Sequence, residues 1–285
     1  MVISIIGVGL LGGSFALALR EKYPNLHLVG VDQSVVNQKI ALAKGLVDEI
    51  LPLEEALQRA ELNVLATPVD SICTLLPQIL DQIPAGRTVM DFGSTKETIC
   101  QAADAHPKRG QFVAVHPMAG TENSGPGAAF FELLPGKNVI ICDRRKSHPD
   151  SLALVEAFLR DVGMKIHYMT PAEHDLHLAY VSHLSHISSF ALGLTVLVKE
   201  KDEKAIFDMA STGFSSTVRL AKSSPAMWAP IFDQNKENVS KALGDYIDLL
   251  NRFKDAIDTQ DLAQSREFMA KANDIGRILG GIEKK

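Results

Sequence analysis

The sequence has little cysteine, few aromatic residues and no excess of positive charge. Its 285 residues include three cysteines, Cys73, Cys100 and Cys142, which lie far apart and form no Cys-x-x-Cys pair. This spacing argues against a disulfide framework and a thiolate zinc site, and it is typical of a reducing compartment. Lys and Arg number 29 against 34 Asp and Glu, a net charge of −5. A nucleic-acid-binding surface needs a basic excess or a basic stripe, so that class is disfavoured.

Long hydrophobic runs are also scarce, and the one at the N-terminus is interrupted by glycine. Residues 2–19 are apolar almost throughout, but four glycines fall inside the run and no basic segment precedes it. A membrane span would satisfy the length. The glycine spacing instead favours a buried strand, a turn and a helix, and the missing basic segment argues against a signal peptide. We therefore expect a soluble, cytoplasmic protein without a membrane partner.

Short apolar runs alternate with helical patterns through the first 169 residues. The expected strands are 2–7, 27–32, 63–67, 88–93, 111–116, 138–142 and 164–168. The expected helices are 10–22, 35–44, 69–82, 95–105 and 150–161. Uninterrupted apolar strands separated by helices predict a parallel sheet that is covered on both faces. We expect residues 1–169 to form an α/β, Rossmann-type, doubly wound domain.

After Thr170 the strand pattern stops and only helical patterns remain, so residues 170–285 predict an all-α second domain. Thr170-Pro171-Ala172-Glu173 has the residues of a capped helix start, and we expect a helix over 171–199. Further helices are expected over 202–211, 216–223, 226–255 and 259–279. One carries an apolar stripe of Val239, Leu243, Tyr246, Ile247, Leu250 and Phe253. Such a stripe packs against other helices or against a second copy of the chain.

The first turn of the chain matches a dinucleotide fingerprint, because Gly7-Val8-Gly9-Leu10-Leu11-Gly12 reads G-x-G-x-x-G. The motif follows a strand, opens a helix and precedes a second strand that ends at Asp32. Gly7 allows the tight turn, Gly9 lets a pyrophosphate approach the backbone, and Gly12 lets the helix pack closely. The Asp32 carboxylate can accept hydrogen bonds from ribose hydroxyls and would repel a 2′-phosphate. The sequence therefore predicts NAD rather than NADP.

Three later strand ends carry residues suited to chemistry. Thr67 and Pro68 end one strand, where a nicotinamide ring would lie. His116 ends another, and a histidine with an ordinary pKa of about 6.5 is a natural proton acceptor. Ser94 lies at the strand end between them and could orient that ring. Both have simpler interpretations, since His116 could be a packed or surface histidine and Ser94 could cap the helix over 95–105.

The long helix carries His174, His177, His183 and His186. At 100° per residue the first two lie roughly opposite the last two, so one metal cannot bind all four and no metal site is expected. We expect His174 and His177 to be solvated, and His183 and His186 to face packed surroundings or a cleft. Arg219 lies within an apolar helical pattern. A buried arginine needs an anionic partner, which is either a structural acid or a substrate carboxylate.

Five segments together resemble the prephenate/arogenate dehydrogenase family: GVGLLGGS at 7–14, DFGSTK at 91–96, HPMAGTE at 116–122, SHLSH at 182–186 and TVRLAKSSPAMW at 217–228. The resemblance implies an oxidative decarboxylation with NAD, of prephenate to 4-hydroxyphenylpyruvate in tyrosine biosynthesis, or of arogenate to tyrosine. It implies that His116 takes the proton of the C4 hydroxyl, that Ser94 hydrogen-bonds in that pocket, and that Arg219 binds a substrate carboxylate. It also implies a substrate site lined by Thr121, His186 and Trp228, and a homodimer formed through the helical domain.

The chain departs from the family pattern at one place. Some family members carry a basic and an acidic residue where this chain has Ser215 and Ser216, so the chain lacks the two charges of an ion-pair gate there. We expect neither a chorismate mutase segment before the glycine motif nor a regulatory domain after residue 285. His186 favours prephenate over arogenate by resemblance. Two other functions are a 3-hydroxyacid dehydrogenase, which would use lysine and asparagine on the long helix, and a non-catalytic NAD-sensing protein.

Overall fold

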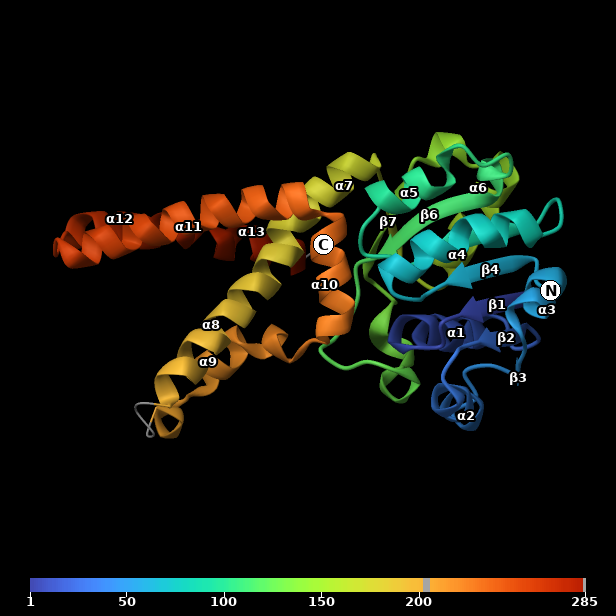
Figure 1. The fold of residues 1–285 in the computed structure, drawn as a ribbon, viewed down its shortest axis with the longest axis horizontal. Helices are drawn as coiled ribbons and strands as arrows, with labels where there is room; N and C mark the ends of the chain where they lie inside the picture. Colours follow the sequence, from blue (N-terminus) through green and yellow to red (C-terminus); the bar gives the residue numbers. More distant parts are fainter. Residues whose placement is uncertain (202–205, 284–285) are drawn as a thin grey trace. The chain divides into compact units, whose positions relative to one another are not determined.

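The computed structural model describes residues 1–201 and 206–283, which fall into two compact units, Met1–Lys236 and Glu237–Lys285. The first unit contains an eight-stranded sheet and the helices up to α10 (Figure 1). The second contains the long helix α11 and two shorter helices. A domain boundary between residues 169 and 170 stays a prediction.

The sheet has the strand order β3-β2-β1-β4-β5-β6-β7-β8. Its strands are β1 (Val2–Ile6), β2 (His27–Val31), β3 (Glu49–Ile50), β4 (Leu62–Leu65), β5 (Thr88–Asp91), β6 (Phe112–Pro117), β7 (Asn138–Cys142) and β8 (Lys165–Met169). The first six run parallel, so their carboxyl ends meet at one edge. The strand order reverses between β1 and β4, and such a reversal is where doubly wound sheets bind ligands.

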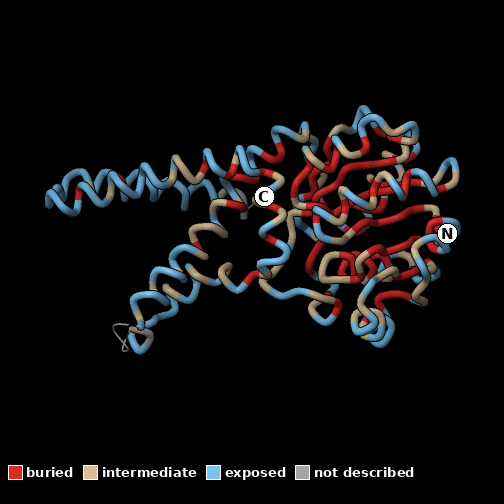
Figure 2. The backbone as a smooth tube through the Cα atoms, viewed as in Figure 1, coloured by how far each residue is buried: buried red, intermediate tan, exposed pale blue. Residues whose placement is uncertain are grey.

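Helices cover both faces of the sheet, as a doubly wound fold requires. They are α1 (Leu10–Lys22), α2 (Val35–Ala43), α3 (Leu53–Arg59), α4 (Val69–Gln82), α5 (Glu97–Asp104) and α6 (Pro149–Asp161). Along β6, Val113 and Val115 pack into the core beneath α1 and α6, while Phe112 and Ala114 pack into the core beneath α4 and α5. Figure 2 shows the central strands as a largely buried layer, whereas the edge strands β3 and β8 are intermediate or exposed. Side chains alternate along a strand, so His116 points to the same face of the sheet as Phe112 and Ala114, the face that α5 covers.

The expected all-parallel sheet is wrong at one edge. Strand β7 runs antiparallel to β6, and β8 runs parallel to β7. The reason lies in the connection after β6, which contains two short 3-10 turns, Pro126–Ala128 and Phe131–Leu133, in place of a crossover helix. A parallel crossover needs about a dozen residues and usually a helix, so the chain returns antiparallel.

The helical part of the first unit begins as the sequence predicts. Helix α7 (Pro171–Leu178) has a complete capping box between Thr170 and Glu173. It continues through a π-helical turn, Ala179–His183, into α8 (Leu184–Glu200). The expected helix over 202–211 lies partly outside the described residues. The expected helix over 216–223 is instead α9 (Thr212–Thr217) followed by a 3-10 turn, Arg219–Lys222.

Two asparagines divide helices that the sequence predicts as continuous. The expected helix over 226–255 is α10 (Pro225–Gln234) and α11 (Lys236–Asp258), separated at Asn235. The Asn235 side chain donates to the Asp175 backbone carbonyl at 2.7 Å, which holds the break in place. The helix over 259–279 is α12 (Leu262–Ala272) and α13 (Asp274–Glu283). In the second unit, Phe253 of α11 packs edge-on against Phe268 of α12.

The apolar N-terminal run forms β1 and α1, as expected. Within the described residues, the helix that could cross a membrane by length and composition is the continuous segment Pro171–Glu200. Only 11% of its most apolar window is buried inside the chain. A single helix of this kind is weak evidence of a membrane, and its exposed apolar side chains equally fit a contact with another protein surface.

Candidate active site

A cavity of about 570 Å³ opens at the carboxyl ends of the parallel strands. On the sheet side it is lined by the glycine turn after β1 and by the residues that follow β4, β5 and β6. On the other side it is lined by the π-helical turn, α8, the Arg219–Lys222 turn and the start of α10. All of these elements belong to the first compact unit. A volume of this size suits a small ligand together with part of a cofactor.

The glycine turn has the close packing that a dinucleotide requires. Gly7 has φ +91°, and a Cβ on Gly12 would lie 2.3 Å from the Gly7 carbonyl oxygen. By contrast, a Cβ on Gly9 would meet nothing within 4 Å, so the backbone there is open to a ligand. Among the described residues no side chain caps the start of α1, which leaves its first N–H groups available for a phosphate. The turn therefore fits a pyrophosphate at the helix N-terminus.

Asp32 follows the end of β2 beside this turn. One carboxylate oxygen accepts a hydrogen bond from the Val8 backbone N–H at 3.2 Å, and the other accepts one from the Ser34 N–H at 2.9 Å. Asp32, Gly7 and Gly12 do not line the cavity, whereas Gly9, Leu10, Leu11, Thr67 and Pro68 do. The residues that we expected to bind a cofactor thus extend from the cavity toward the end of β2.

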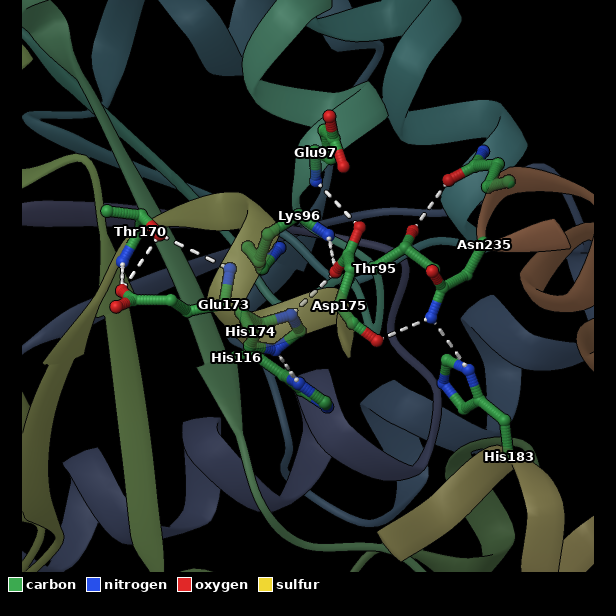
Figure 3. Close-up of polar contacts among 12 residues, drawn as sticks. Thr95, Lys96, Glu97, His116, Thr170, Glu173, His174, Asp175, His183 and Asn235 are labelled. Carbon is green, nitrogen blue, oxygen red and sulfur yellow. Dashed lines mark hydrogen bonds and ion pairs between the residues drawn. The ribbon is translucent and has the colours of Figure 1, made fainter. Parts of the chain in front are cut away.

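His116 lies at the end of β6, is 8% exposed and lines the cavity. Its Nδ1 is 2.8 Å from Nε2 of His174, and His174 Nδ1 is 2.7 Å from a carboxylate oxygen of Asp175 (Figure 3). Burial holds the pKa of His116 well below its usual value, and the neighbouring His174, Lys96 and His183 lower it further. His116 is therefore an uncharged imidazole at neutral pH.

His174 corrects the sequence prediction, which left it solvated. It is fully buried, and burial lowers its pKa even though the Asp175 hydrogen bond opposes that shift. The prediction from a spacing of 100° per residue failed for two reasons. Helix α7 packs against the end of the sheet, and a π-helical turn, Ala179–His183, interrupts the regular spacing. His177 is exposed as expected. His183 is buried, with a pKa of about 4 caused mainly by burial, also as expected.

Ser94 lines the cavity and does not cap the following helix. Helix α5 begins two residues later than predicted, at Glu97. Its N-terminus is capped from α7, because the Asp175 carboxylate accepts hydrogen bonds from the backbone N–H groups of Lys96 at 2.7 Å and Glu97 at 2.9 Å. The Lys96 side chain is fully buried and pairs with the equally buried Asp91. Ser94 is thus free to face a ligand.

The predicted aromatic and imidazole lining is present on the helical side. His186 stacks on Trp228 with ring centroids 3.5 Å apart, and both line the cavity. The Trp228 indole N–H is buried and has no hydrogen-bond partner among the described residues. Thr121 also lines the cavity, from the loop after β6.

Arg219 lines the cavity but is not buried, which corrects the sequence expectation. Half of its side chain (51%) is exposed, and its guanidinium donates to the Glu122 carboxylate at 2.9 Å. A backbone hydrogen bond and the Arg219 contact lower the pKa of Glu122 below its usual value. The pair can exchange partners with a ligand carboxylate at little cost because water reaches it.

The cavity thus collects His116, Ser94, Arg219, Thr121, His186 and Trp228 from distant parts of the chain. Sequence reasoning missed Glu122, although it lies inside the HPMAGTE segment. It also missed His174 and Asp175, and the one signal available was their position in the first turns of a well-capped helix. No group of three or more potential metal ligands occurs among residues 1–201 and 206–283.

Comparison with known proteins gives a consistent family. Residues 15–168 match the model for the nucleotide-binding domain of prephenate dehydrogenase, and residues 170–271 match the model for its dimerization domain. The chain is 29% identical to the prephenate dehydrogenase of Bacillus subtilis over 95% of this chain and 74% of that protein. It is 28% identical to the cyclohexadienyl dehydrogenase of Zymomonas mobilis over 91% of this chain and 89% of that protein.

Solved structures give the same result. The A. aeolicus prephenate dehydrogenase in complex with hydroxyphenyl propionate and NAD+ matches with a TM-score of 0.88 and 32% identity over 98% of this chain and 97% of that one. The Synechocystis arogenate dehydrogenase matches with a TM-score of 0.78 and 29% identity over 98% and 100% of the two chains. A protein described as similar to 3-hydroxyacid dehydrogenases reaches 0.50 at 16% identity, which shows only a shared fold.

Proposed function

The chain belongs to the prephenate dehydrogenase family, and from that premise we propose that it oxidatively decarboxylates prephenate to 4-hydroxyphenylpyruvate with NAD in tyrosine biosynthesis. Arogenate, which would give tyrosine, is the alternative, because the relatives include both kinds of enzyme. The observation that carries the proposal is the shared cavity: an uncharged buried imidazole and an exposed guanidinium line it beside an open glycine turn.

In this proposal the chain supplies a base, a carboxylate clamp and a place for the cofactor. Gly7 and Gly12 would allow the tight turn and the close helix packing that let Gly9, Leu10 and Leu11 approach the pyrophosphate at the start of α1. Asp32 would bind the adenosine ribose. Thr67 and Pro68 would lie against the nicotinamide ring. When bound, NAD supplies the hydride acceptor for the substrate ring.

His116 would accept the proton of the C4 hydroxyl through Nε2 as the C4 hydride departs. The bond from the ring to its carboxylate then breaks, CO2 leaves, and the electron pair makes the ring aromatic. His116 returns its proton to the phenolate oxygen, so the imidazole is regenerated. Ser94 would donate a hydrogen bond to the reacting oxygen and thereby fix its orientation.

Arg219 would bind a substrate carboxylate, in exchange for Glu122. A bidentate guanidinium contact suits a carboxylate better than an ammonium does. Thr121, His186 and Trp228 would line the rest of the substrate site. The chain itself needs mainly to position groups, since aromatisation supplies the driving force.

We also infer a cytoplasmic homodimer. The matched family model is named for dimerization. Helix α8 exposes Leu194, Leu197 and Val198 by more than half, and α11 exposes Ile247 and Leu250 by nearly half. Exposed apolar rows of this kind are stabilised when a second copy covers them. Light scattering should give twice the mass of one chain.

The direct test follows NADH absorbance with prephenate or arogenate and with NAD or NADP. We expect turnover of prephenate with NAD and 4-hydroxyphenylpyruvate as the product. Preference for arogenate would favour the alternative substrate. NAD binding without turnover of either substrate would contradict the proposal and favour an NAD-sensing role.

Cofactor choice has its own test. Asp32→Asn removes the charge that would repel a 2′-phosphate, so the preference for NAD over NADP in kcat/KM should fall by roughly 10-fold. Asp150→Asn is the matched control, because the Asp150 side chain is 96% exposed on α6. An unchanged cofactor ratio in the Asp32 variant would place the ribose contact elsewhere.

A further inference from the structure

Two buried residues behind His116 form a continuous hydrogen-bonded row with it. Nδ1 of His116 contacts Nε2 of His174 at 2.8 Å, and Nδ1 of His174 contacts Oδ1 of Asp175 at 2.7 Å. His174 is 0% exposed and Asp175 is 1% exposed. Figure 3 shows the row running from the end of β6 into helix α7. Neither His174 nor Asp175 lines the cavity, so both act on a ligand only through His116.

Asp175 is held in its ionised form by the N-terminus of α5. Its two carboxylate oxygens accept the backbone N–H groups of Lys96 and Glu97, which are free donors at the start of that helix. A negative charge at a helix N-terminus is favourable. Burial by itself would raise the pKa of the carboxyl, but the His174 hydrogen bond and the two backbone donors outweigh it and leave the pKa below its usual value.

An ionised Asp175 fixes the hydrogens along the whole row. A carboxylate can only accept, so Nδ1 of His174 carries a hydrogen, and the neutral His174 ring then has a bare Nε2. A bare Nε2 accepts, so the hydrogen between the two rings belongs to Nδ1 of His116. We propose that His174 and Asp175 are positioning residues that hold His116 in the tautomer with hydrogen on Nδ1 and a lone pair on Nε2.

This tautomer is the one that a base in the cavity needs. His116 uses Nδ1 on His174, and its Nε2 has no hydrogen bond to any residue in the described ranges. When Nε2 takes a proton, the new cation on His116 faces a neutral ring that the Asp175 carboxylate polarises. The row therefore compensates a charge that burial would otherwise disfavour. The identity of the proton taken rests on the proposed function, whereas the tautomer does not.

The tautomer can be measured without any substrate. Long-range ¹H–¹⁵N spectra of the protein labelled at histidine nitrogens distinguish protonated from bare ring nitrogens, and His116→Asn identifies the His116 signals by their loss. We expect hydrogen on Nδ1 and a bare Nε2 in His116. A bare Nδ1 would overturn the proposal.

Asp175→Asn removes the negative charge from the row. Oδ1 of Asp175 accepts from both the Lys96 backbone N–H and Nδ1 of His174, and Oδ2 accepts from the Glu97 backbone N–H, so the amide N–H₂ faces a donor in either orientation. When the N–H₂ faces His174, the hydrogens of the row reverse and Nε2 of His116 is no longer bare. When it faces Glu97, the tautomer is kept, but the cation formed on His116 loses its compensating charge. We expect kcat to fall roughly 10²- to 10⁴-fold, as for other histidine bases that lose their orienting carboxylate. KM and NADH affinity should stay within about 2-fold, since neither residue lines the cavity.

Glu173→Gln is the matched control for that change. Glu173 is the neighbouring acid in α7, is exposed, and hydrogen-bonds to Thr170 rather than to either histidine. It should keep the normal kcat and the normal His116 tautomer. Equal losses in the Glu173 and Asp175 variants would assign Asp175 a structural role only and would overturn the proposal.

Two substitutions of His174 test the row if the Asp175 variant does not fold. In His174→Gln the amide oxygen can accept from Nδ1 of His116 and preserve its tautomer, so kcat should stay within about 10-fold of normal. In His174→Leu that acceptor is lost and kcat should fall by about 100-fold or more. Similar kcat values in these two variants would overturn the proposal. If the expected tautomer is observed but neither prephenate nor arogenate is turned over, the proposed function fails and the positioning role stands.

Discussion

Two polar contacts beside the same cavity have nearly the same length, but they differ in their access to water. The His174–Asp175 contact is 2.7 Å, with side chains 0% and 2% exposed, whereas the Arg219–Glu122 contact is 2.9 Å, with side chains 51% and 29% exposed. A buried charge needs its partner continuously. At an exposed charge, water can replace the partner. The buried contact is therefore suited to fixing a protonation state, and the exposed pair to releasing a group to a ligand.

The difference predicts that substitutions in the buried row change kcat and that substitutions in the exposed pair change KM. His116→Asn is the strongest test. Asparagine can keep a hydrogen bond to His174 but cannot take up a proton near neutral pH, so kcat should fall roughly 10²- to 10⁴-fold. NADH affinity, measured by fluorescence, should stay within about 2-fold. Turnover near the normal rate would show that the base lies elsewhere.

The sequence was sufficient to predict the edge of the sheet at which His116 lies. Strand-end reasoning placed the glycine turn, Ser94 and His116 at one edge, because parallel strands with helical crossovers must share it. The sequence pattern predicts neither β3 nor α3. The strand Glu49–Ile50 is too short to show a pattern, and the helix Leu53–Arg59 is only seven residues long. The longer helices were predicted, whereas the breaks at Asn235 and Asn273 were not.

Long-range contacts account for what sequence periodicity could not predict. The Asp175 carboxylate caps a helix 78 residues away in sequence, and His174 contacts a strand end 58 residues away. Neither pairing leaves a local signal. Arg219 was expected to be buried because apolar residues flank it, but it lies in a 3-10 turn over Arg219–Lys222 and half of its side chain is exposed. Its partner Glu122 lies 97 residues away.

The pH dependence of turnover sharpens the contrast. His116 accepts a proton only when Nε2 is bare, so kcat falls as the pH drops through its pKa. Burial, with His174, Lys96 and His183, places that pKa well below 6.5. We expect kcat to stay level from pH 8 to about 6.5 and to decline at lower pH, by up to 10-fold per unit once below the pKa. A decline that begins above pH 7 would contradict the assignment of His116.

Arg219→Lys tests the exposed side of the cavity. An ammonium keeps the charge but cannot form the bidentate contact with a carboxylate, so KM for prephenate should rise about 10-fold while kcat changes little. Lys222→Arg, on the same turn, is the matched control, since Lys222 does not line the cavity. A loss of kcat with unchanged KM would place Arg219 with the buried row rather than with substrate binding.

Glu122→Gln should give the smallest effect, in the opposite direction. Glu122 competes with the substrate for Arg219, and its low pKa keeps it ionised throughout the working pH range. Removing its charge frees the guanidinium, so KM for prephenate should fall about 2- to 5-fold, in line with the modest strength of exposed ion pairs. Added salt screens the same pair, so the difference in KM between the variant and the normal protein should shrink between 50 mM and 500 mM salt. A steady-state series over salt concentration measures both effects. If KM rises instead, Glu122 holds Arg219 in the orientation that binds substrate, and even the exposed pair then has a fixed geometry.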